Sequence, residues 1–433
     1  STMIARRVPP PADTARVIVP GLCRGDLAEA QSVLGVPVIR GPNDLKDLPA
    51  YFGREGAVPE LTRHDVMIFA EIVDAPALTV EQILERAESY AADGADVIDL
   101  GCLPDTPFPH LEDAVQALRS AGRRVSVDSV SADDLFRAGR AGADYLLSLS
   151  EETLWVADEV RSIPVLIPRS QGDMDSLYRS IERMQAAGRR FIADSVLDPI
   201  HFGFTASLGR YAELRRRFPD IEIMMGIGNL TELTEADTTG IHAVLFGVIS
   251  ELRIGSVLTT QVSPHARSAV REAELARRIM FAARAEDRLP KGLDGGLLAI
   301  HDRKPFPYSE AEVRELAAQI RDPSYRVHVT EEGIHVFNRD GLLTGRDPFE
   351  LFPRLGAVQA DAPHAFYMGV ELARARIAWQ LGKRYVQDEE LRWGVAVSSE
   401  VVPPEDGGAH AYKAAGSTLQ ASAATRKKRR RKK

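Results

Sequence analysis

The stretch Arg124–Ser129, RVSVDS, decides the fold class of this chain. Val125 and Val127 alternate with small or polar residues, which is the pattern of a β-strand. Asp128 ends this strand just before SADDLFRAGRAG (131–142), which has the composition of a helix. An acidic residue between a strand and the following helix lies where (β/α)8 barrels place their functional groups. The same strand–helix unit recurs on both sides of this stretch.

Eight such units are predicted between residues 64 and 286. The strands are near-continuous apolar runs, as expected for parallel strands that are covered on both faces. Several of the intervening helices end in Gly after a small residue, which is a helix-stop signal. We therefore predict an α/β fold, a (β/α)8 TIM barrel; a doubly wound open sheet is the alternative, but no GxGxxG follows the first strand. The predicted strands are HDVMIFAEIVD (64–74), ADVIDLG (95–101), RVSVDS (124–129), DYLLSLS (144–150), IPVLIPR (163–169), RRFIADSVLDP (189–199), IEIMMGIGN (221–229) and HAVLFGVIS (242–250).

The segments on either side of the barrel (61–288) differ from it in pattern. Residues 1–60 predict a small N-terminal βαβ extension and 289–400 a C-terminal α+β domain. Residues 401–433 contain few bulky apolar residues and are predicted to be a disordered basic tail. The N-terminal extension comprises strands at 16–20 and 36–42 with helices at 26–35 and 43–53; the C-terminal domain comprises a strand at 297–302, a helix at 309–322, two strands within 325–345 and a long helix at 364–386.

Composition and charge restrict the class of protein. The 433 residues are 44% hydrophobic and 27% charged, as in a globular protein, and contain no apolar run long enough to span a membrane. The two cysteines, Cys23 and Cys102, have neither a disulfide framework nor metal-ligand spacing, so we predict a cytoplasmic location. Subtracting the eight positive charges of 426–433 from the net charge of −8 leaves −16 on the preceding residues. This acidic body argues against nucleic-acid binding by the whole protein. The tail is either solvated or makes a weak contact with nucleic acid or an anionic surface.

The candidate site residues are those expected at the C-terminal ends of the barrel strands. Carboxylates there would accept N–H bonds from a donor-rich, guanidine-like ring, and the helix start after the eighth strand would bind an anionic group. No metal site is predicted, since HxH and HExxH patterns are absent from the sequence. The candidates are Glu71, Asp74, Asp99, Asp128, Ser129, Ser148, Arg169, Asp198, Asn229, Glu232, His265 and Arg267.

Several of these candidates also have purely structural explanations. Asp128 is a suitable N-cap for the helix that follows it. Asp198 precedes Pro199, and Asp-Pro is an ordinary turn starter. The site interpretation depends on these residues meeting at one end of a barrel rather than on any one of them. The other structural explanations are a turn before Pro76 for Asp74, a loop-positioning role for Asp99, and a solvated first helical turn for His265 and Arg267.

Three motifs resemble those of the dihydropteroate synthase family, in order and at fitting spacing: GADVIDLG (Gly94–Gly101), RVSVDS (Arg124–Ser129) and VLDPIHFGF (Val196–Phe204). That family consists of (β/α)8 pterin-binding barrels, and the resemblance covers about residues 64–286. The GIGNLTEL segment (Gly226–Leu233) and the flanking domains look like the related proteins of tetrahydromethanopterin-producing archaea and methylotrophic bacteria.

The resemblance implies catalytic roles for two aspartates: Asp128 would bind the pterin ring, and Asp198 would pair with its amino group and ring nitrogen. Other positions depart from the family pattern. Ser148 falls near a family asparagine, Asn229 and Leu230 replace a Ser-Arg-Lys run, and the closing Arg-x-His motif is present only as His265-x-Arg267. EIVDAP (Glu71–Pro76) replaces an Asn-x-Thr-Pro-Asp segment. These departures are compatible with a different amine substrate or with loss of catalysis.

The leading hypothesis implied by the resemblance is a transferase of one-carbon metabolism. It would condense a dihydropterin-6-ylmethyl diphosphate with an arylamine, with Mg²⁺ as a candidate cofactor. The expected amine is 4-(β-D-ribofuranosyl)aminobenzene 5′-phosphate rather than 4-aminobenzoate, and Arg169 with His301, Arg303 and Lys304 are candidates for its phosphate site. The alternatives are a methyltransferase acting on a methylated tetrahydropterin with a corrinoid partner protein, and a non-catalytic pterin-binding scaffold. The resemblance is also compatible with a homodimer.

Overall fold

The computed structural model describes residues 11, 13–21, 23, 26–42, 47–53, 61–103 and 106–397. The contacts between residues divide the chain into two compact units, Ser1–Pro59 and Glu60–Lys433. The basic tail predicted at 401–433 lies outside the described residues. Among the described helices, none combines the length and the apolar character that crossing a membrane requires.

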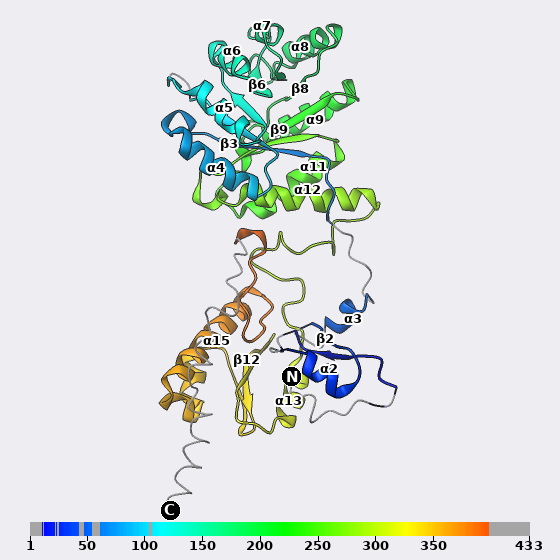
Figure 1. Ribbon diagram of the computed structural model, residues 1–433, viewed down its shortest axis with the longest axis vertical. Helices are drawn as coiled ribbons and strands as arrows, with labels where there is room; N and C mark the ends of the chain where they lie inside the picture. The colour runs from blue at the N-terminus through cyan, green and yellow to red at the C-terminus, as the bar shows by residue number, and fades with distance from the viewer. Residues whose placement is uncertain are drawn as a thin grey trace, which may run out of the picture. The chain divides into compact units, whose positions relative to one another are not determined.

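The second unit contains a closed barrel of eight parallel strands (Figure 1). Neighbouring strands pair in the order β10-β3-β4-β5-β6-β7-β8-β9, so the sheet has no free edge. The predicted TIM barrel is confirmed, and the open doubly wound sheet is excluded. The strands are β3 (Met67–Ile72), β4 (Val97–Gly101), β5 (Val125–Asp128), β6 (Tyr145–Leu149), β7 (Ile163–Leu166), β8 (Ile192–Ala193), β9 (Glu222–Gly226) and β10 (Ser256–Thr260).

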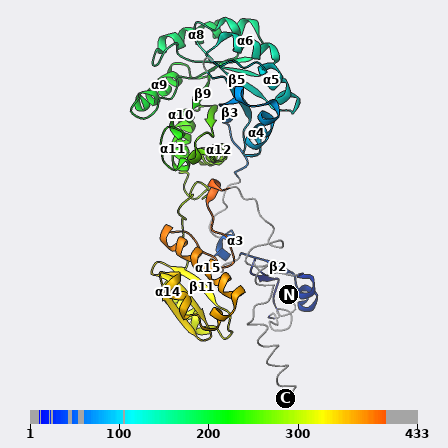
Figure 2. The ribbon, with the colours of Figure 1, turned by 90° about the vertical axis from the view of Figure 1, so that its left-hand side faces the viewer.

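Helices surround the strands, as Figure 2 shows. Local sequence explains where several of them begin and end: α4 starts with a capping box between Thr79 and Gln82, and α6 ends at Gly142, whose φ of 102° suits glycine. The helices of the barrel are α4 (Val80–Ala92), α5 (Leu111–Ser120), α6 (Ala132–Ala141), α7 (Trp155–Glu159), α8 (Met174–Ala186), α9 (Phe204–Arg217), α10 (Gly228–Thr231), α11 (Thr238–Glu251) and α12 (Ala269–Ala285), with 3-10 turns η2 (Ala75–Ala77) and η3 (Pro264–Ala266).

Strand alternation separates two apolar layers. One face of each strand packs in the large cluster that includes the helices, with residues such as Ile68, Ile98 and Val127. The opposite face forms a smaller cluster inside the barrel, to which Phe69 and Val97 belong. Because successive side chains point to opposite faces, the residues two positions after the interior ones also point inward. This alternation determines which polar side chains reach the barrel mouth.

The prediction of the eighth strand was wrong. HAVLFGVIS (242–250) lies within helix α11, and the eighth strand is β10, in the next segment of the chain. The buried residues of α11 recur every three or four positions, at His242, Phe246 and Ile249 among others, as in a helix covered by a neighbour. A short apolar run does not by itself distinguish a buried helix from a buried strand.

The first unit has the predicted βαβ topology. Strand β1 (Val17–Val19) pairs in parallel with β2 (Val38–Arg40), and α2 (Ala28–Leu34) connects them. A short helix, α3 (Leu48–Tyr51), follows.

The segment after the barrel is the predicted α+β arrangement, with two differences. The sheet has three antiparallel strands instead of two, because the chain turns again after β12. No strand forms at 297–302; the Lys383 Nζ instead binds the carbonyl oxygens of Ala299 and Ile300, at 2.8 and 3.0 Å. The elements are α13 (Glu310–Gln319), β11 (Arg326–Thr330), β12 (Gly333–Asn338), β13 (Gly341–Gly345), α14 (Pro348–Leu351) and α15 (Ala362–Leu381), with 3-10 turns η4 (Phe352–Arg354), η5 (Gly356–Ala360) and η6 (Gly394–Ala396).

Candidate functional site

A cavity of about 570 Å³ opens at the C-terminal ends of the barrel strands. Polar side chains and small residues from several strands line it, and apolar side chains from the barrel interior form its floor. Five of the sequence-predicted residues line this cavity: Glu71, Asp128, Ser148, Asn229 and Glu232. It therefore lies at the end of the barrel where the sequence predicted a site.

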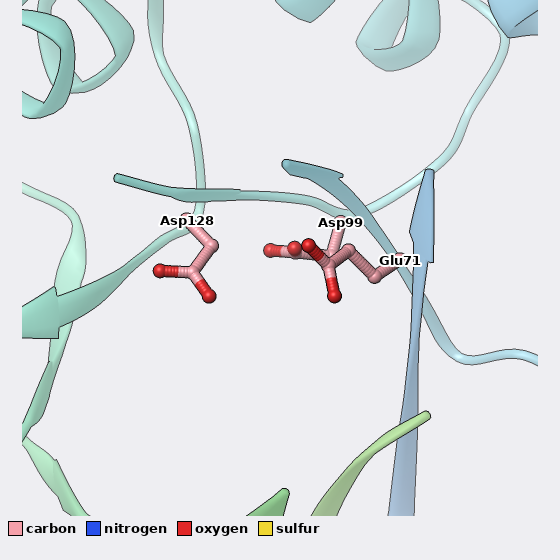
Figure 3. A group of neighbouring side chains, drawn as sticks. All are labelled: Glu71, Asp99 and Asp128. Carbon is pink, nitrogen blue, oxygen red and sulfur yellow. The ribbon is translucent and has the colours of Figure 1, made fainter. Parts of the chain in front are cut away.

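Three carboxylates from adjacent strands converge at one side of the mouth (Figure 3). Glu71 and Asp99 each lie two positions after an interior residue, Phe69 and Val97, and so point into the barrel. One oxygen from each of Glu71, Asp99 and Asp128 lies within 4.8 Å of the other two. Gly101 on β4 leaves room for this arrangement, because a Cβ there would lie 2.5 Å from Glu71 Oε1.

Burial and the repulsion between neighbouring carboxylates raise the pKa values of these three carboxyl groups. Burial and the neighbouring Asp128 raise the pKa of Glu71 from 4.5 to about 8. Burial, Glu71 and Asp128 raise the pKa of Asp99 well above its ordinary value, and burial also raises the pKa of Asp128. Serine hydroxyls oppose this effect: Ser126 Oγ donates to Asp99 Oδ1 and Ser148 Oγ to Asp128 Oδ1, each at 2.5 Å. These three acids therefore tend to share protons near neutral pH.

Sequence analysis missed Asp194, which lines the cavity on the opposite side of the barrel. Strand β8 ends at Ala193, and Asp194 follows Ile192 by two positions, so it points to the interior. Tyr211 Oη and the Val196 N–H both donate to Asp194 Oδ1, at 2.5 and 2.7 Å. Burial raises the pKa of Asp194 to about 6, although these hydrogen bonds favour its ionised form.

A signal for Asp194 was present in the sequence. FIAD (191–194) repeats the alternation of VSVD (125–128), with an acid at the same position. The prediction instead extended the sixth strand to Pro199, which transferred the strand-end role to Asp198.

Two lining residues have unusual backbone conformations. Ser148 and Val196 have φ values of 65° and 64°, in the left-handed region that side-chain-bearing residues seldom adopt. The conformation is most costly for the β-branched Val196, and strain of this kind concentrates at functional sites.

Asn229 and Glu232 line the cavity and also form hydrogen bonds that hold the surrounding loops together. Asn229 Nδ2 donates to the Leu197 carbonyl at 2.8 Å. Glu232 accepts from the N–H groups of Val262 and Ser263, both at 2.8 Å. Burial alone would raise the pKa of Glu232, but these donors hold it below its ordinary value. Glu232 is therefore an ionised carboxylate that connects the loops after β9 and β10.

Asp198, predicted to be catalytic, does not line the cavity. It is 5% exposed and forms a 2.7 Å ion pair with Arg210, which also donates to the Val196 carbonyl. The chain leaves the barrel wall after Asp194, so Asp198 belongs to the loop that follows and anchors it to α9.

Besides Asp198, six predicted residues lie outside the cavity lining: Asp99, which is adjacent to Glu71 and Asp128, and five others. Asp74 precedes the 3-10 turn η2 and pairs with Arg86, as its structural alternative proposed. Ser129 accepts from the Ser131 N–H, and Ser131 rather than Asp128 is the N-cap of α6. The other three have these surroundings: Arg169 pairs with Asp173, His265 contacts the Thr231 carbonyl, and Arg267 lies in the turn after η3.

The charge of the cavity is one-sided. Glu71, Asp128, Asp194 and Glu232 line it, and no Lys, Arg or His does so within the described part of the chain. Asp99 lies just behind Glu71 and Asp128 and adds a fifth carboxyl group. Such a cavity suits a ring that donates several N–H bonds, or a cation, better than a bare anion.

Comparisons with known proteins locate similarities for different parts of the chain. A family model described as "Family of unknown function (DUF6513)" matches residues 1–43. An uncharacterized protein of Methanocaldococcus jannaschii is 27% identical over 367 residues, covering 75% of this chain and 69% of that protein.

Similar solved structures include three dihydropteroate synthases. The Yersinia pestis enzyme with a pterine-sulfa conjugate has a TM-score of 0.40 and 19% identity, covering 52% of this chain and 95% of its own. The Coxiella burnetii enzyme in complex with pteroic acid has a TM-score of 0.43 and 16% identity, covering 52% and 94%. The Vibrio fischeri enzyme has a TM-score of 0.41 and 14% identity, covering 53% and 96%.

Proposed function

We propose that the barrel mouth binds a reduced pterin and that the protein is a pterin-dependent transferase. The observation that carries this proposal is the placement of Asp128 and Asp194 on different sides of one cavity. The amino-pyrimidinone edge of a pterin presents several N–H donors, for which ionised carboxylates are the strongest acceptors. The apolar floor of the cavity suits the flat faces of the ring.

The proposed reaction joins a dihydropterin-6-ylmethyl diphosphate to an arylamine. The amine nitrogen attacks the exocyclic methylene carbon, the carbon–oxygen bond to diphosphate breaks, and the amine loses a proton. Carboxylates beside the ring stabilise the positive charge that spreads over it as the diphosphate departs. Asp128 and Asp194 are assigned this role; Asp194 takes the place that sequence analysis gave to Asp198.

We also propose Mg²⁺ as a cofactor, because carboxylate oxygens are the hard donors that this ion prefers. Bound at the mouth, it would supply the positive charge that the cavity-lining side chains lack. The amine we propose is 4-(β-D-ribofuranosyl)aminobenzene 5′-phosphate, which would place the protein in tetrahydromethanopterin biosynthesis. Arg169 pairs with Asp173 and His301 with the Leu381 carbonyl, so neither supports the predicted phosphate site.

The experiment is amine-dependent diphosphate release by the purified chain with the dihydropterin diphosphate and Mg²⁺. The ribosylated amine phosphate and 4-aminobenzoate are tested in parallel. We expect release with the ribosylated amine, and its loss in Asp128→Asn and Asp194→Asn. Glu85→Gln, on the exposed face of α4, is the charge-matched control. Absence of release with both amines, while a dihydropterin still binds, would refute the transferase.

A second candidate function is pterin binding without turnover. The absence of any cationic side chain among the described cavity-lining residues favours it, since a leaving diphosphate needs positive charge. Under this alternative a dihydropterin without diphosphate binds at least as tightly as its diphosphate, with or without Mg²⁺. Calorimetric titration of both ligands distinguishes the two functions.

A further inference from the structure

We infer that Glu71, Asp99 and Asp128 form a divalent-cation site that is occupied even when no pterin is bound. Three carboxylate oxygens within 4.8 Å of one another, from three adjacent strands, can ligate one hard cation from the same side. The residue types exclude a soft-metal site, because no Cys or His belongs to the group. The chemical class is therefore a hard divalent cation such as Mg²⁺ or Mn²⁺.

An unpartnered atom at this position points to a ligand independently of the clustering. Asp99 is fully buried, and its Oδ2 has no hydrogen-bond partner among the described residues. A buried carboxylate oxygen without a partner is costly, and native structures seldom retain one. Its other oxygen already accepts from Ser126, so that hydrogen bond orients the carboxyl group while Oδ2 stays available.

The surrounding side chains offer no other source of positive charge. The barrel does pair buried acids with arginines elsewhere, as Arg210 with Asp198 shows. Among the described residues, no arginine, lysine or histidine forms an ion pair with Glu71, Asp99 or Asp128, and no arginine or lysine lines the cavity. A bound cation would relieve the repulsion between the three carboxyl groups more completely than shared protons do.

The cation site also predicts that cation binding and pterin binding affect each other. This part of the inference rests on the proposed function. Asp128 belongs to the acidic group and lines the cavity, whereas Asp99 does not line it. Asp194, after β8, lies on the far side of the closed barrel from β4. Cation and pterin would therefore share Asp128, and Asp99→Asn removes a cation ligand without removing a cavity-lining carboxylate.

The experiment measures Mn²⁺ binding to the full chain after chelator treatment, by electron paramagnetic resonance at pH 8.5 with no pterin present. We expect saturable binding of one Mn²⁺ per chain and competition by Mg²⁺. Asp99→Asn and Glu71→Gln should each weaken binding at least tenfold, whereas Glu85→Gln should bind as the parent does. A melting curve of each variant confirms that it is folded.

Two results would overturn the inference. One is a folded parent protein that shows no saturable Mn²⁺ binding at pH 8.5. In that case the three acids would only exchange protons with the solvent and would not bind a cation. The other is a folded Asp99→Asn or Glu71→Gln variant with unchanged affinity. Because pterin is absent, this experiment can fail while the proposed function stands. Conversely, Mn²⁺ binding without any pterin binding would retain the cation site and refute the pterin site.

Discussion

The two ends of strand β4 place an aspartate in opposite surroundings. Asp96, just before the strand, pairs with Arg277 of α12, which is only 3% exposed. Arg277 also pairs with Glu274 and donates to the Val66 and Gly94 carbonyls, at 2.6 and 3.1 Å. Three residues later Asp99 faces the mouth, with a serine hydroxyl on one oxygen and, within the described part of the chain, no hydrogen-bond partner on the other.

This difference between the two aspartates suggests that one end of β4 stabilises the fold and that the other end forms part of the candidate site. At the N-terminal end, a charge network joins the last helix of the barrel to its first strands and closes the structure. At the C-terminal end, the same residue type lies among other acids, and the fold gains nothing from their repulsion. In (β/α)8 barrels the C-terminal end generally carries the site, and these charges agree with that rule.

The largest expected effect is a loss of stability caused by a substitution at the N-terminal end of β4. Arg277→Met should lower the free energy of unfolding by about 2–3 kcal/mol, because it removes a charged donor from the partly buried Asp96 and from the Val66 and Gly94 carbonyls, while Glu274 keeps Arg278. Denaturant unfolding of the full chain measures this loss. Asp99→Asn, at the other end of β4, should not destabilise the metal-free protein, because burial, Glu71 and Asp128 already disfavour the ionised form of this carboxyl group and an amide oxygen can still accept from Ser126. If both variants lose similar stability, the contrast between the two ends is wrong.

The next largest effect concerns ligand binding by Asp194, on the side of the cavity opposite to Glu71 and Asp128. Asp194→Asn should weaken binding of a dihydropterin by roughly ten- to hundredfold, since a hydrogen bond to a charged group contributes about 1.5–3 kcal/mol. Calorimetric titration measures the affinity. Asp198→Asn serves as the comparison, because its partner is Arg210 and its main expected effect is a lower melting temperature. Equal loss of affinity in both variants would restore Asp198 to the site.

A smaller effect is the response of stability to pH. The pKa of Glu71 is raised in the folded protein, so the folded state binds its proton more tightly than the unfolded state does. This contribution is complete below the ordinary pKa of 4.5 and is lost as the pH rises through about 8. Melting temperatures of the chelated protein should therefore fall across this range. Glu71→Gln should flatten the dependence, and an unchanged slope in that variant would contradict the repulsion described here.

The smallest effect tests how Asp194 is positioned. Tyr211→Phe removes the hydroxyl donor to Asp194 Oδ1, a change of about 1 kcal/mol that should raise the pKa of this carboxyl above about 6. As the pH is lowered, the affinity for a dihydropterin should therefore start to fall earlier in the variant, at a higher pH than in the parent protein. Affinity titrated against pH reports this shift, and a purely structural role for Tyr211 would lower stability without moving the midpoint.

Local sequence pattern was sufficient for most of the fold. Seven of the eight barrel strands, the βαβ extension and the long helix α15 follow from runs of apolar residues and their stop signals. The eighth strand was missed because α11 is apolar over a length that both a strand and a buried helix allow. Only the packing of α11 against α12, with His242 3.0 Å from Glu272, distinguishes the two.

Strand position in the sequence was enough to find the strand-end acids Glu71, Asp99 and Asp128. Only the tertiary structure decided which acids meet. Asp194 and Asp198 are four residues apart, yet one lines the cavity and the other pairs with Arg210. Strand ends are defined to within a few residues by local pattern, whereas the inward direction of a side chain alternates at every residue. A strand end misplaced by a few residues was therefore enough to select Asp198, which lies outside the cavity lining, instead of Asp194, which lines it.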